Sequence, residues 1–119
     1  WEEIYNYVRN KKINVILDTD TYNECDDQFA LSYLIKNQAK FNIEAITVSP
    51  YSHRTIGVSV SEGQELSYRE ILKICSWLNF DVINKVFKGA TDYIQNGYNE
   101  NNDAVNKIIE IANKNEKTL

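Results

Sequence analysis

The chain contains one short apolar run that constrains the fold more than any other feature. Residues 13–17 read Ile-Asn-Val-Ile-Leu, and Asp18 ends the run abruptly. A run that is this short, rich in β-branched side chains and apolar on both faces is typical of a strand buried on both sides in a parallel sheet. Consecutive parallel strands need a crossover connection, which is usually a helix. The run therefore predicts an α/β fold.

The pattern that follows this run fits such a crossover. We expect a polar loop over 18–25, a helix over 26–36 and a second strand over 41–48. The helix has an apolar stripe at helical spacing, which is widened by Phe29 and Tyr33. The order strand, loop, helix, strand predicts a βαβ unit with a right-handed crossover.

The remaining segments continue this alternation. They are a short helix over 2–9, a long polar loop over 49–63, a helix over 65–78, a strand within 82–87 and a last helix over 103–113. The apolar face of the last helix comprises Val105, Ile108, Ile109 and Ala112. Three aromatic side chains are assigned to the core and not to a ligand site: Tyr68, Trp77 and Phe87. Together these elements predict one α/β domain over 1–119, with a Rossmann-like, mostly parallel sheet flanked by helices.

Acidic residues are concentrated in the loop after the first strand. The chain has 17 acidic and 13 basic residues and a net charge of -4, and no Lys or Arg lies within 18–27. Five acids fall in these ten residues: Asp18, Asp20, Glu24, Asp26 and Asp27. Without clusters of Lys and Arg, the chain has no electrostatic footprint for nucleic acid. Without a run of roughly 20 apolar residues, it has no candidate membrane span.

The position of these acids predicts a ligand site. Ligands of α/β sheets bind beyond the carboxyl ends of the strands, which is where this loop lies. Each close pair of like charges costs on the order of 1 to 4 kcal/mol, so the loop needs compensation from a cation, from raised carboxylate pKa values or from a helix N-terminus. Oxygen donors alone favour Ca²⁺ or Mg²⁺ over Zn²⁺. The plainer interpretation is that the acids are solvated loop and helix-start residues.

Two familiar acidic-loop templates fit incompletely. An EF-hand loop that begins at Asp18 fails at its fifth, sixth and twelfth positions, which are Tyr22, Asn23 and Phe29. The haloacid-dehalogenase-type phosphatases place Asp-x-Asp-x-Thr/Val directly after a strand. The run Asp18-Thr19-Asp20-Thr21 fits that pattern, but Tyr22 breaks its fifth position, and the pattern has no use for a later Asp-Asp pair.

A third template fits best. The segment 15–31 resembles the N-terminal signature of the nucleoside hydrolases, which is an apolar strand, Asp-Thr-Asp, a short loop, Asp-Asp and a small apolar helix start. The usual members place three residues between the two acidic motifs, whereas this chain has five, Thr21 to Cys25, as in a divergent bacterial branch. The family's Gly-Gly-Asn-like turn after the second strand is replaced here by Ser49-Pro50-Tyr51-Ser52, so no ribose contact is carried over to that loop.

The resemblance implies a Ca²⁺-dependent N-ribohydrolase, which cleaves the N-glycosidic bond of ribonucleosides to give free base and ribose. Asp20 and Asp27 would be metal ligands, and Asp20 would also take the proton from the attacking water. On the substrate side, Asp26 would hydrogen-bond a ribose hydroxyl and Asp18 would support the cluster. Salvage of purines and pyrimidines is the metabolic role that this reaction implies.

The resemblance also carries expectations for the chain as a whole. The family domain is more than twice as long, so the 119 residues are expected to form its incomplete N-terminal part, to bind Ca²⁺ weakly and to lack appreciable activity alone. Self-association into a homo-oligomer is a further expectation. Cys25 and Cys75 cannot form a disulfide scaffold and are interpreted as inert, which favours a reducing compartment, the cytoplasm.

Two other functions remain open at this point. One is a Mg²⁺-dependent phosphatase of the dehalogenase type, with Asp18 as nucleophile and Asp20 as acid and base. The other is a non-catalytic, cation-binding fragment. The sequence also leaves open whether Tyr22, Glu24 and His53, the only histidine, contribute to the site.

Overall fold

The computed structural model describes residues 2–3, 11–97 and 101–114. At its centre is a parallel sheet of three strands in the order β1-β2-β3. The strands are β1 (Ile13–Thr19), β2 (Phe41–Val48) and β3 (Val86–Lys88). The predicted α/β class with a parallel sheet is thereby confirmed, and the arrangement is compatible with a Rossmann-like fold.

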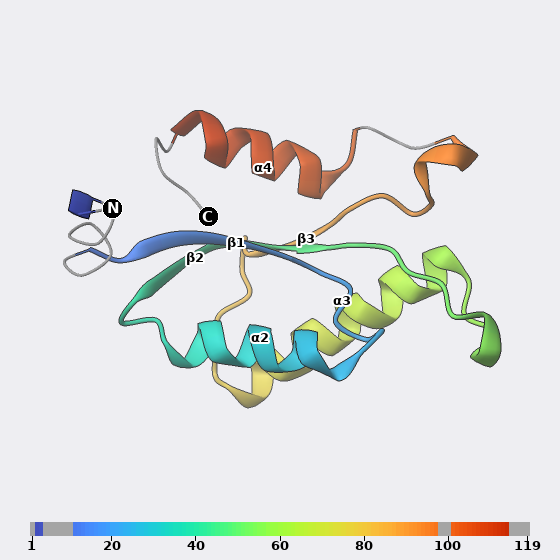
Figure 1. The fold of residues 1–119 in the computed structure, drawn as a ribbon, viewed down its shortest axis with the longest axis horizontal. Coiled ribbons are helices and arrows are strands. Elements are labelled where there is room, and N and C mark those ends of the chain that lie inside the picture. The colour runs from blue at the N-terminus through green and yellow to red at the C-terminus, as the bar shows by residue number, and fades with distance from the viewer. Residues whose placement is uncertain (1, 4–10, 98–100, 115–119) are drawn as a thin grey trace.

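Helices cover both faces of this sheet, as predicted. Between residues 11 and 114, the described helices are α2 (Cys25–Lys36), α3 (Val60–Trp77) and α4 (Asp103–Lys114), and two short 3₁₀ turns, η1 (Arg54–Ile56) and η2 (Ile94–Asn96), lie between them. Figure 1 shows α2 and α3 together on one face and α4 alone on the other. No helix within the described part of the chain is both long and apolar enough to cross a membrane.

The hydrophobic core lies between the sheet and the layer formed by α2 and α3. Its buried members are Leu31, Leu34, Ile35, Ile43, Ile46, Val48, Ile71, Ile74 and Cys75. The predicted stripe on α2 is too wide, because Phe29 is 73% exposed and Tyr33 is 57% exposed. A helix at the outer layer of a three-stranded sheet buries only the stripe that faces the strands, and its flanks remain in solvent.

Trp77 is a second correction to the predicted core. Its side chain is 70% exposed at the last turn of α3, so its assignment to the core is wrong. Tyr68 is partly buried and packs against the core, and Phe87 is partly buried on β3. On α4 the buried residues are Ala104 and Ile111, whereas the predicted face is mostly exposed, with Ile108 at 37% and Ile109 at 53%. With no second helix beside it on that face of the sheet among the described residues, α4 buries a narrow stripe.

Some element boundaries differ from those predicted. α3 begins at Val60 and not at 65, because the Ser59 hydroxyl caps the helix by accepting a hydrogen bond from the Glu62 backbone N–H. β3 occupies only the end of the predicted window 82–87 and runs one residue beyond it, because residues 83–85 form a turn that Asp81 stabilises through the Ile83 N–H. The helix predicted over 2–9 falls largely outside the described residues.

The three strands end level with one another, which positions the loops that follow them. Thr19 pairs with Val48, and Val48 pairs with Lys88. Beyond these pairs, the Ser49 N–H donates to the Thr19 carbonyl and the Gly89 N–H donates to the Val48 carbonyl, each at 3.0 Å. The loops after β1, β2 and β3 therefore leave from one edge of the sheet, the carboxyl edge.

Candidate functional site

The loop after β1 is held by hydroxyl groups that point into the protein. Thr19 is 3% exposed and donates from its hydroxyl to Oδ2 of Asp27 at 2.8 Å. The hydroxyls of Thr19 and Thr21 lie 2.7 Å apart, and since Thr19 gives its one hydrogen to Asp27, Thr21 is the donor in this bond. The backbone N–H of Asp20 also donates to Oδ2 of Asp27, at 3.2 Å. These bonds draw the first turn of α2 over the loop.

As a result, Asp20 and Asp27, which we call the acidic pair, lie beside each other at the carboxyl edge. A tight turn shapes the loop between them, with the Asn23 N–H bonded to the Asp20 carbonyl at 2.7 Å and the Asn23 side chain bonded to Oδ2 of Asp20 at 3.0 Å. Burial and then the neighbouring Asp27 carboxyl raise the pKa of Asp20, against the opposing effect of Asn23. Two adjoining carboxylates repel each other when both are ionised, and a proton or a cation relieves the repulsion.

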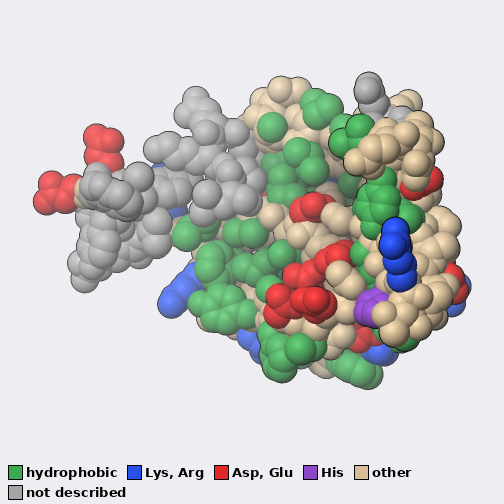
Figure 2. Space-filling model, turned by 45° about the vertical axis from the view of Figure 1, so that its right-hand side comes forward, with side chains coloured by type: hydrophobic (Ala, Val, Ile, Leu, Met, Phe, Trp, Pro, Cys, Tyr) green, Lys and Arg blue, Asp and Glu red, His purple; other side chains and the backbone are tan. Residues whose placement is uncertain are grey.

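The other three acids of the loop have different surroundings. Glu24, at the N-cap of α2, and Asp26, in its first turn, are exposed. Asp18 accepts a hydrogen bond from the hydroxyl of Thr47, at 2.7 Å, across the β1–β2 pairing. It also lines a hollow of about 280 Å³ that α4 borders through Val105 and Ile108. Figure 2 shows acidic side chains gathered near the middle of one face, with the histidine beside them.

The structure therefore places Asp20 beside Asp27, whereas in the described part of the chain no hydrogen bond joins Asp18 or Asp26, the other two predicted site residues, to this pair. Within the described residues, no group of three or more His, Cys, Asp or Glu side chains is arranged to hold a metal ion. Calcium takes about six to eight oxygen ligands, and the pair supplies two carboxylates beside threonine hydroxyls. Two carboxylates are ligands of the kind that a hard cation prefers, and they are fewer than such a cation usually takes from a protein.

One face of α3 anchors the loops at the carboxyl edge. Ser67, which is fully buried, accepts a hydrogen bond from the backbone N–H of Tyr22 at 3.1 Å. Gln64, which is 4% exposed, donates from its side chain to the carbonyls of Gly89, at 2.9 Å, and Ala90. These two side chains fix the loops that follow β1 and β3.

The same helix face holds the loop after β2 by close backbone packing. Gly63 presses against Tyr51, and a Cβ built at Gly63 would lie 2.1 Å from the Tyr51 carbonyl oxygen. Gly63, Gln64 and Ser67, which we call the anchor face, thus contact all three loops. Sequence reasoning assigned α3 to the apolar core alone and missed this role. The available signal was spacing, because positions 64 and 67 continue the stripe that leads to Ile71.

The loop after β2 contains two unusual polar atoms. The hydroxyl of Tyr51 and Nδ1 of His53 are the buried side-chain polar atoms without a hydrogen-bond partner in the described part of the chain. Tyr51 is 4% exposed. Burial raises the pKa of its phenol, and Tyr22, Asp20 and Glu62 raise it further, in that order. The Tyr51 ring therefore belongs to the surroundings of the acidic pair, although sequence reasoning gave it no role.

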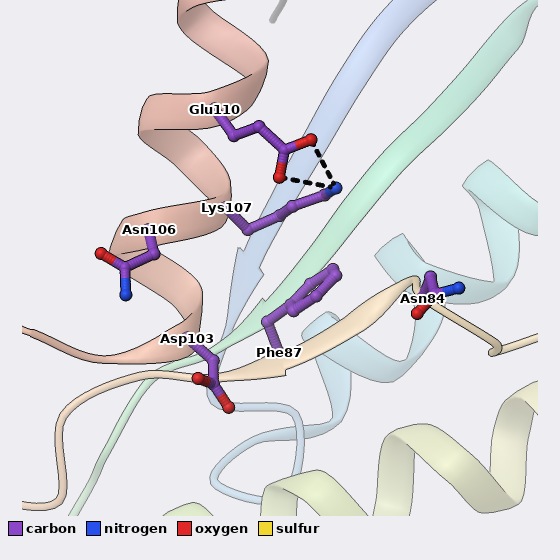
Figure 3. Close-up of a pocket in the computed structure, with 6 residues that line it drawn as sticks. All are labelled: Asn84, Phe87, Asp103, Asn106, Lys107 and Glu110. Carbon is purple, nitrogen blue, oxygen red and sulfur yellow. Dashed lines mark hydrogen bonds and ion pairs between the residues drawn. The ribbon is translucent and has the colours of Figure 1, made fainter.

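A larger hollow, of about 400 Å³, lies between β3 and α4 (Figure 3). Its lining residues are Asn84, Phe87, Asp103, Asn106, Lys107 and Glu110. The Lys107 ammonium lies 3.2 Å from both carboxylate oxygens of Glu110 and 5.4 Å from the centre of the Phe87 ring. Glu110 already neutralises Lys107, the cation that lines this hollow, and no residue of the loop after β1 lines it. Its larger size therefore does not make it a better candidate for the functional site than the carboxyl edge.

The two cysteines lie in different surroundings. Burial raises the pKa of the Cys75 thiol to about 11, so this thiol stays protonated at neutral pH. Cys25 is exposed at the start of α2.

Comparisons of the chain with protein-family models, with curated proteins and with solved structures found no match. The assignment of a function therefore depends on the chemistry at the carboxyl edge.

Proposed function

We propose that this chain carries the cation- and ribose-binding edge of a Ca²⁺-dependent N-ribohydrolase, which cleaves ribonucleosides to free base and ribose. The observation that carries the proposal is the acidic pair. Asp20 and Asp27 are seven residues apart in the sequence, yet they adjoin beyond the carboxyl end of a parallel strand. This is the part of an α/β sheet where ligands bind. The resemblance of residues 15–31 to the nucleoside hydrolase signature supports the same activity.

In this proposal, Asp20 and Asp27 would hold the cation, which would offset their mutual repulsion and would supply a more acidic water. Asp20, as a carboxylate, accepts the proton of the attacking water. The reaction passes through an oxocarbenium-like state, and nearby carboxylates stabilise its positive charge. Asp26, exposed next to Asp27, hydrogen-bonds a ribose hydroxyl, and Asp18, oriented by Thr47, supports the substrate side.

The phosphatase alternative has less support from the geometry. A phosphatase of the dehalogenase type needs Asp18 as nucleophile and Asp20 as acid and base on one phosphoryl group. Here Asp18 is bonded to Thr47 and faces a hollow beside α4, whereas Asp20 adjoins Asp27. The pairing of Asp20 with Asp27 has a use in the hydrolase and none in the phosphatase.

The test compares two assays on the natural product of the gene that encodes this chain. Ribose release from inosine and uridine is measured with Ca²⁺, and phosphate release from p-nitrophenyl phosphate is measured with Mg²⁺. We expect ribose release that EDTA abolishes and that Asp20→Asn lowers by about 100-fold or more. Asp81→Asn, an exposed acid at the turn before β3, is the matched control and should keep full activity.

Asp18→Asn separates the two enzymes. It should abolish a phosphatase outright and only weaken a hydrolase. Phosphate release that depends on Asp18, without ribose release, would overturn the proposal in favour of the phosphatase. Ca²⁺ binding without either activity would leave a non-catalytic, cation-binding protein.

A further inference from the structure

β1 lies at one edge of the sheet, although its sequence is typical of an interior strand. In the part of the chain that the structure describes, the strand order β1-β2-β3 gives β1 a single neighbour, β2. The apolar side chains of Val15, Ile16 and Leu17 are only half-buried. In an interior strand of a parallel sheet, such side chains are covered on both faces. The free side of β1 is therefore an apolar strand edge that no described strand covers.

The two ends of β1 show which of its backbone groups are used within the chain. The Ile13 N–H donates a hydrogen bond to the Lys40 carbonyl at 2.8 Å. At the other end, the Thr19 carbonyl accepts a hydrogen bond from the Ser49 N–H at 3.0 Å. Both ends therefore bond toward β2 through odd-numbered residues.

The even-numbered residues consequently face the free edge, because successive residues of a strand direct their N–H and C=O groups to alternate sides. The irregularity in the pairing of β1 with β2 falls on β2, where one residue is skipped, so the alternation along β1 is kept. The N–H and C=O groups of Asn14, Ile16 and Asp18 then point away from β2. Such a row of backbone donors and acceptors is a template for pairing with another strand.

The two edges of the sheet differ in how well they are protected against such pairing. Proteins protect strand edges with very short strands, with Pro, with charged residues or with bulges on the edge strand. β3, at the other edge, has three residues. β1 has seven residues, contains no Pro, and carries its one charged residue, Asp18, near its end. The edge of β1 is thus the one suited to pairing.

We propose that β1 pairs with β1 of a second copy of this chain, in antiparallel orientation, around a two-fold axis at Ile16. This register pairs every residue of the strand, and residues whose backbone groups point outward lie opposite one another, as an antiparallel ladder requires. It places the Asn14 amide of one copy opposite the Asp18 carboxylate of the other. It also brings the end that carries Lys12 toward the end that carries Asp20. The strand edge is therefore complementary in charge to itself, which a two-fold interface needs.

The contacts within one copy leave both paired side chains able to make this bond. Asn14 uses its side-chain oxygen to accept from the Asn42 amide, at 2.9 Å, so its own NH₂ group can donate. Asp18 is exposed, and its Oδ1 accepts from the Thr47 hydroxyl, at 2.7 Å, so its Oδ2 can accept from the second copy. The inference goes beyond the proposed function and needs no bound cation.

The test measures self-association of the 119-residue chain by sedimentation equilibrium, and circular dichroism checks the folding of each variant. We expect a dimer that Asn14→Asp weakens about tenfold or more, because it sets carboxylates opposite each other. The double variant Asn14→Asp/Asp18→Asn exchanges the two side chains and should restore the affinity, since each position keeps an oxygen for its acceptor role within the copy. Gln95→Glu, at an exposed position of η2, adds the same charge outside β1 and should leave the dimer unchanged.

A second readout uses the unaltered chain and does not depend on the folding of any variant. The N–H groups of Asn14 and Ile16 should become protected from hydrogen exchange as the chain concentration rises, whereas those of Val15 and Leu17 should be protected throughout by β2. A chain that sediments as a monomer at every concentration would overturn the inference. A dimer would also overturn it if the exchange of side chains fails to restore the affinity or if the Ile16 N–H stays unprotected, because the interface would then lie elsewhere.

Discussion

The backbone N–H of Tyr22 donates a hydrogen bond to the hydroxyl of Ser67, at 3.1 Å, across 45 residues of sequence. This bond joins the loop after β1 to the anchor face of α3. Ser67 is fully buried, so its hydroxyl has no access to water and its partner in the structure is this N–H. The position of the loop, and with it the acidic pair, depends on a residue far from it in the chain.

Ser67→Ala should therefore loosen the loop without removing an acid. The Tyr22 N–H would lose its partner, and the free energy of unfolding should fall by about 1 to 2 kcal/mol, the usual cost of leaving one buried group unsatisfied. Urea unfolding followed by circular dichroism measures the change. Ser76→Ala, at an exposed position of the same helix, is the control and should stay within about 0.5 kcal/mol of the unaltered chain. Equal stability of the two variants would contradict the anchoring role.

Gly63→Ala should be more damaging, although alanine is the better helix former. The new Cβ would lie 2.1 Å from the carbonyl oxygen of Tyr51, and backbone on both sides cannot yield as a side-chain end could. Overpacking of this kind typically costs about 1 to 3 kcal/mol. Thermal unfolding should show a lower melting temperature for this variant and a small or opposite effect for Ser61→Ala, which is exposed two residues earlier in α3.

The acidic pair should make stability depend on pH in a definite direction. The folded state raises the pKa of Asp20 above its ordinary value of 3.8, so the folded chain holds this proton at a pH where the unfolded chain has lost it. The contribution of Asp20 is therefore most favourable below the ordinary pKa and declines as the pH rises through the raised one. Asp20→Asn should remove that decline and raise the melting temperature at neutral pH, with little difference at about pH 3, all without Ca²⁺.

Asp92→Asn serves as the control of opposite sign. Hydrogen bonds from the Asn96 side chain and from the Tyr93 backbone lower the pKa of Asp92. Its ionised form is thus favoured in the folded state, and its small contribution is present at neutral pH and lost in acid. A gain in melting temperature at neutral pH from Asp92→Asn as large as that from Asp20→Asn would show that net charge, and not the acidic pair, governs the pH dependence.

Calcium should stabilise the unaltered chain through Asp27. A ligand that binds only the folded state raises the melting temperature in proportion to the logarithm of its concentration once the site is saturated. Asp27→Asn keeps an oxygen that can accept from the Thr19 hydroxyl and the Asp20 N–H, so it should fold normally and lose this rise. The measurement is thermal unfolding at increasing Ca²⁺ with constant ionic strength. A rise in the variant equal to that of the unaltered chain would place the ion elsewhere.

The fold was predictable wherever the sequence pattern is local. β1 and β2 are short β-branched runs, and the apolar spacing of α2 identifies its buried stripe at Leu31 and Leu34. The exposure of Phe29 and Trp77 was not predictable in this way. Helical spacing identifies which residues share a face, but how wide a face is buried depends on how many neighbours pack around the helix.

The candidate site was likewise predictable only in part from the sequence. The acids were identifiable because they crowd into one loop directly after a buried strand. Spacing alone did not show which of them adjoin, since that depends on which carboxylate the Thr19 hydroxyl reaches and on the tight turn at Asn23. The resemblance to nucleoside hydrolases is what named Asp20 and Asp27 together. The anchor face and Tyr51 were missed for another reason. Each is defined by a contact between segments distant in sequence, and polar residues such as Gln and Ser are mostly exposed in proteins.

The level ending of the three strands under one helix face has a consequence for how this molecule opens. Because Gly63, Gln64 and Ser67 hold all three loops, fraying of the first turns of α3 would free every one of them at once. The carboxyl edge should then behave as a single cooperative unit, whose amide protons exchange with solvent in one concerted event while the strands beneath stay protected.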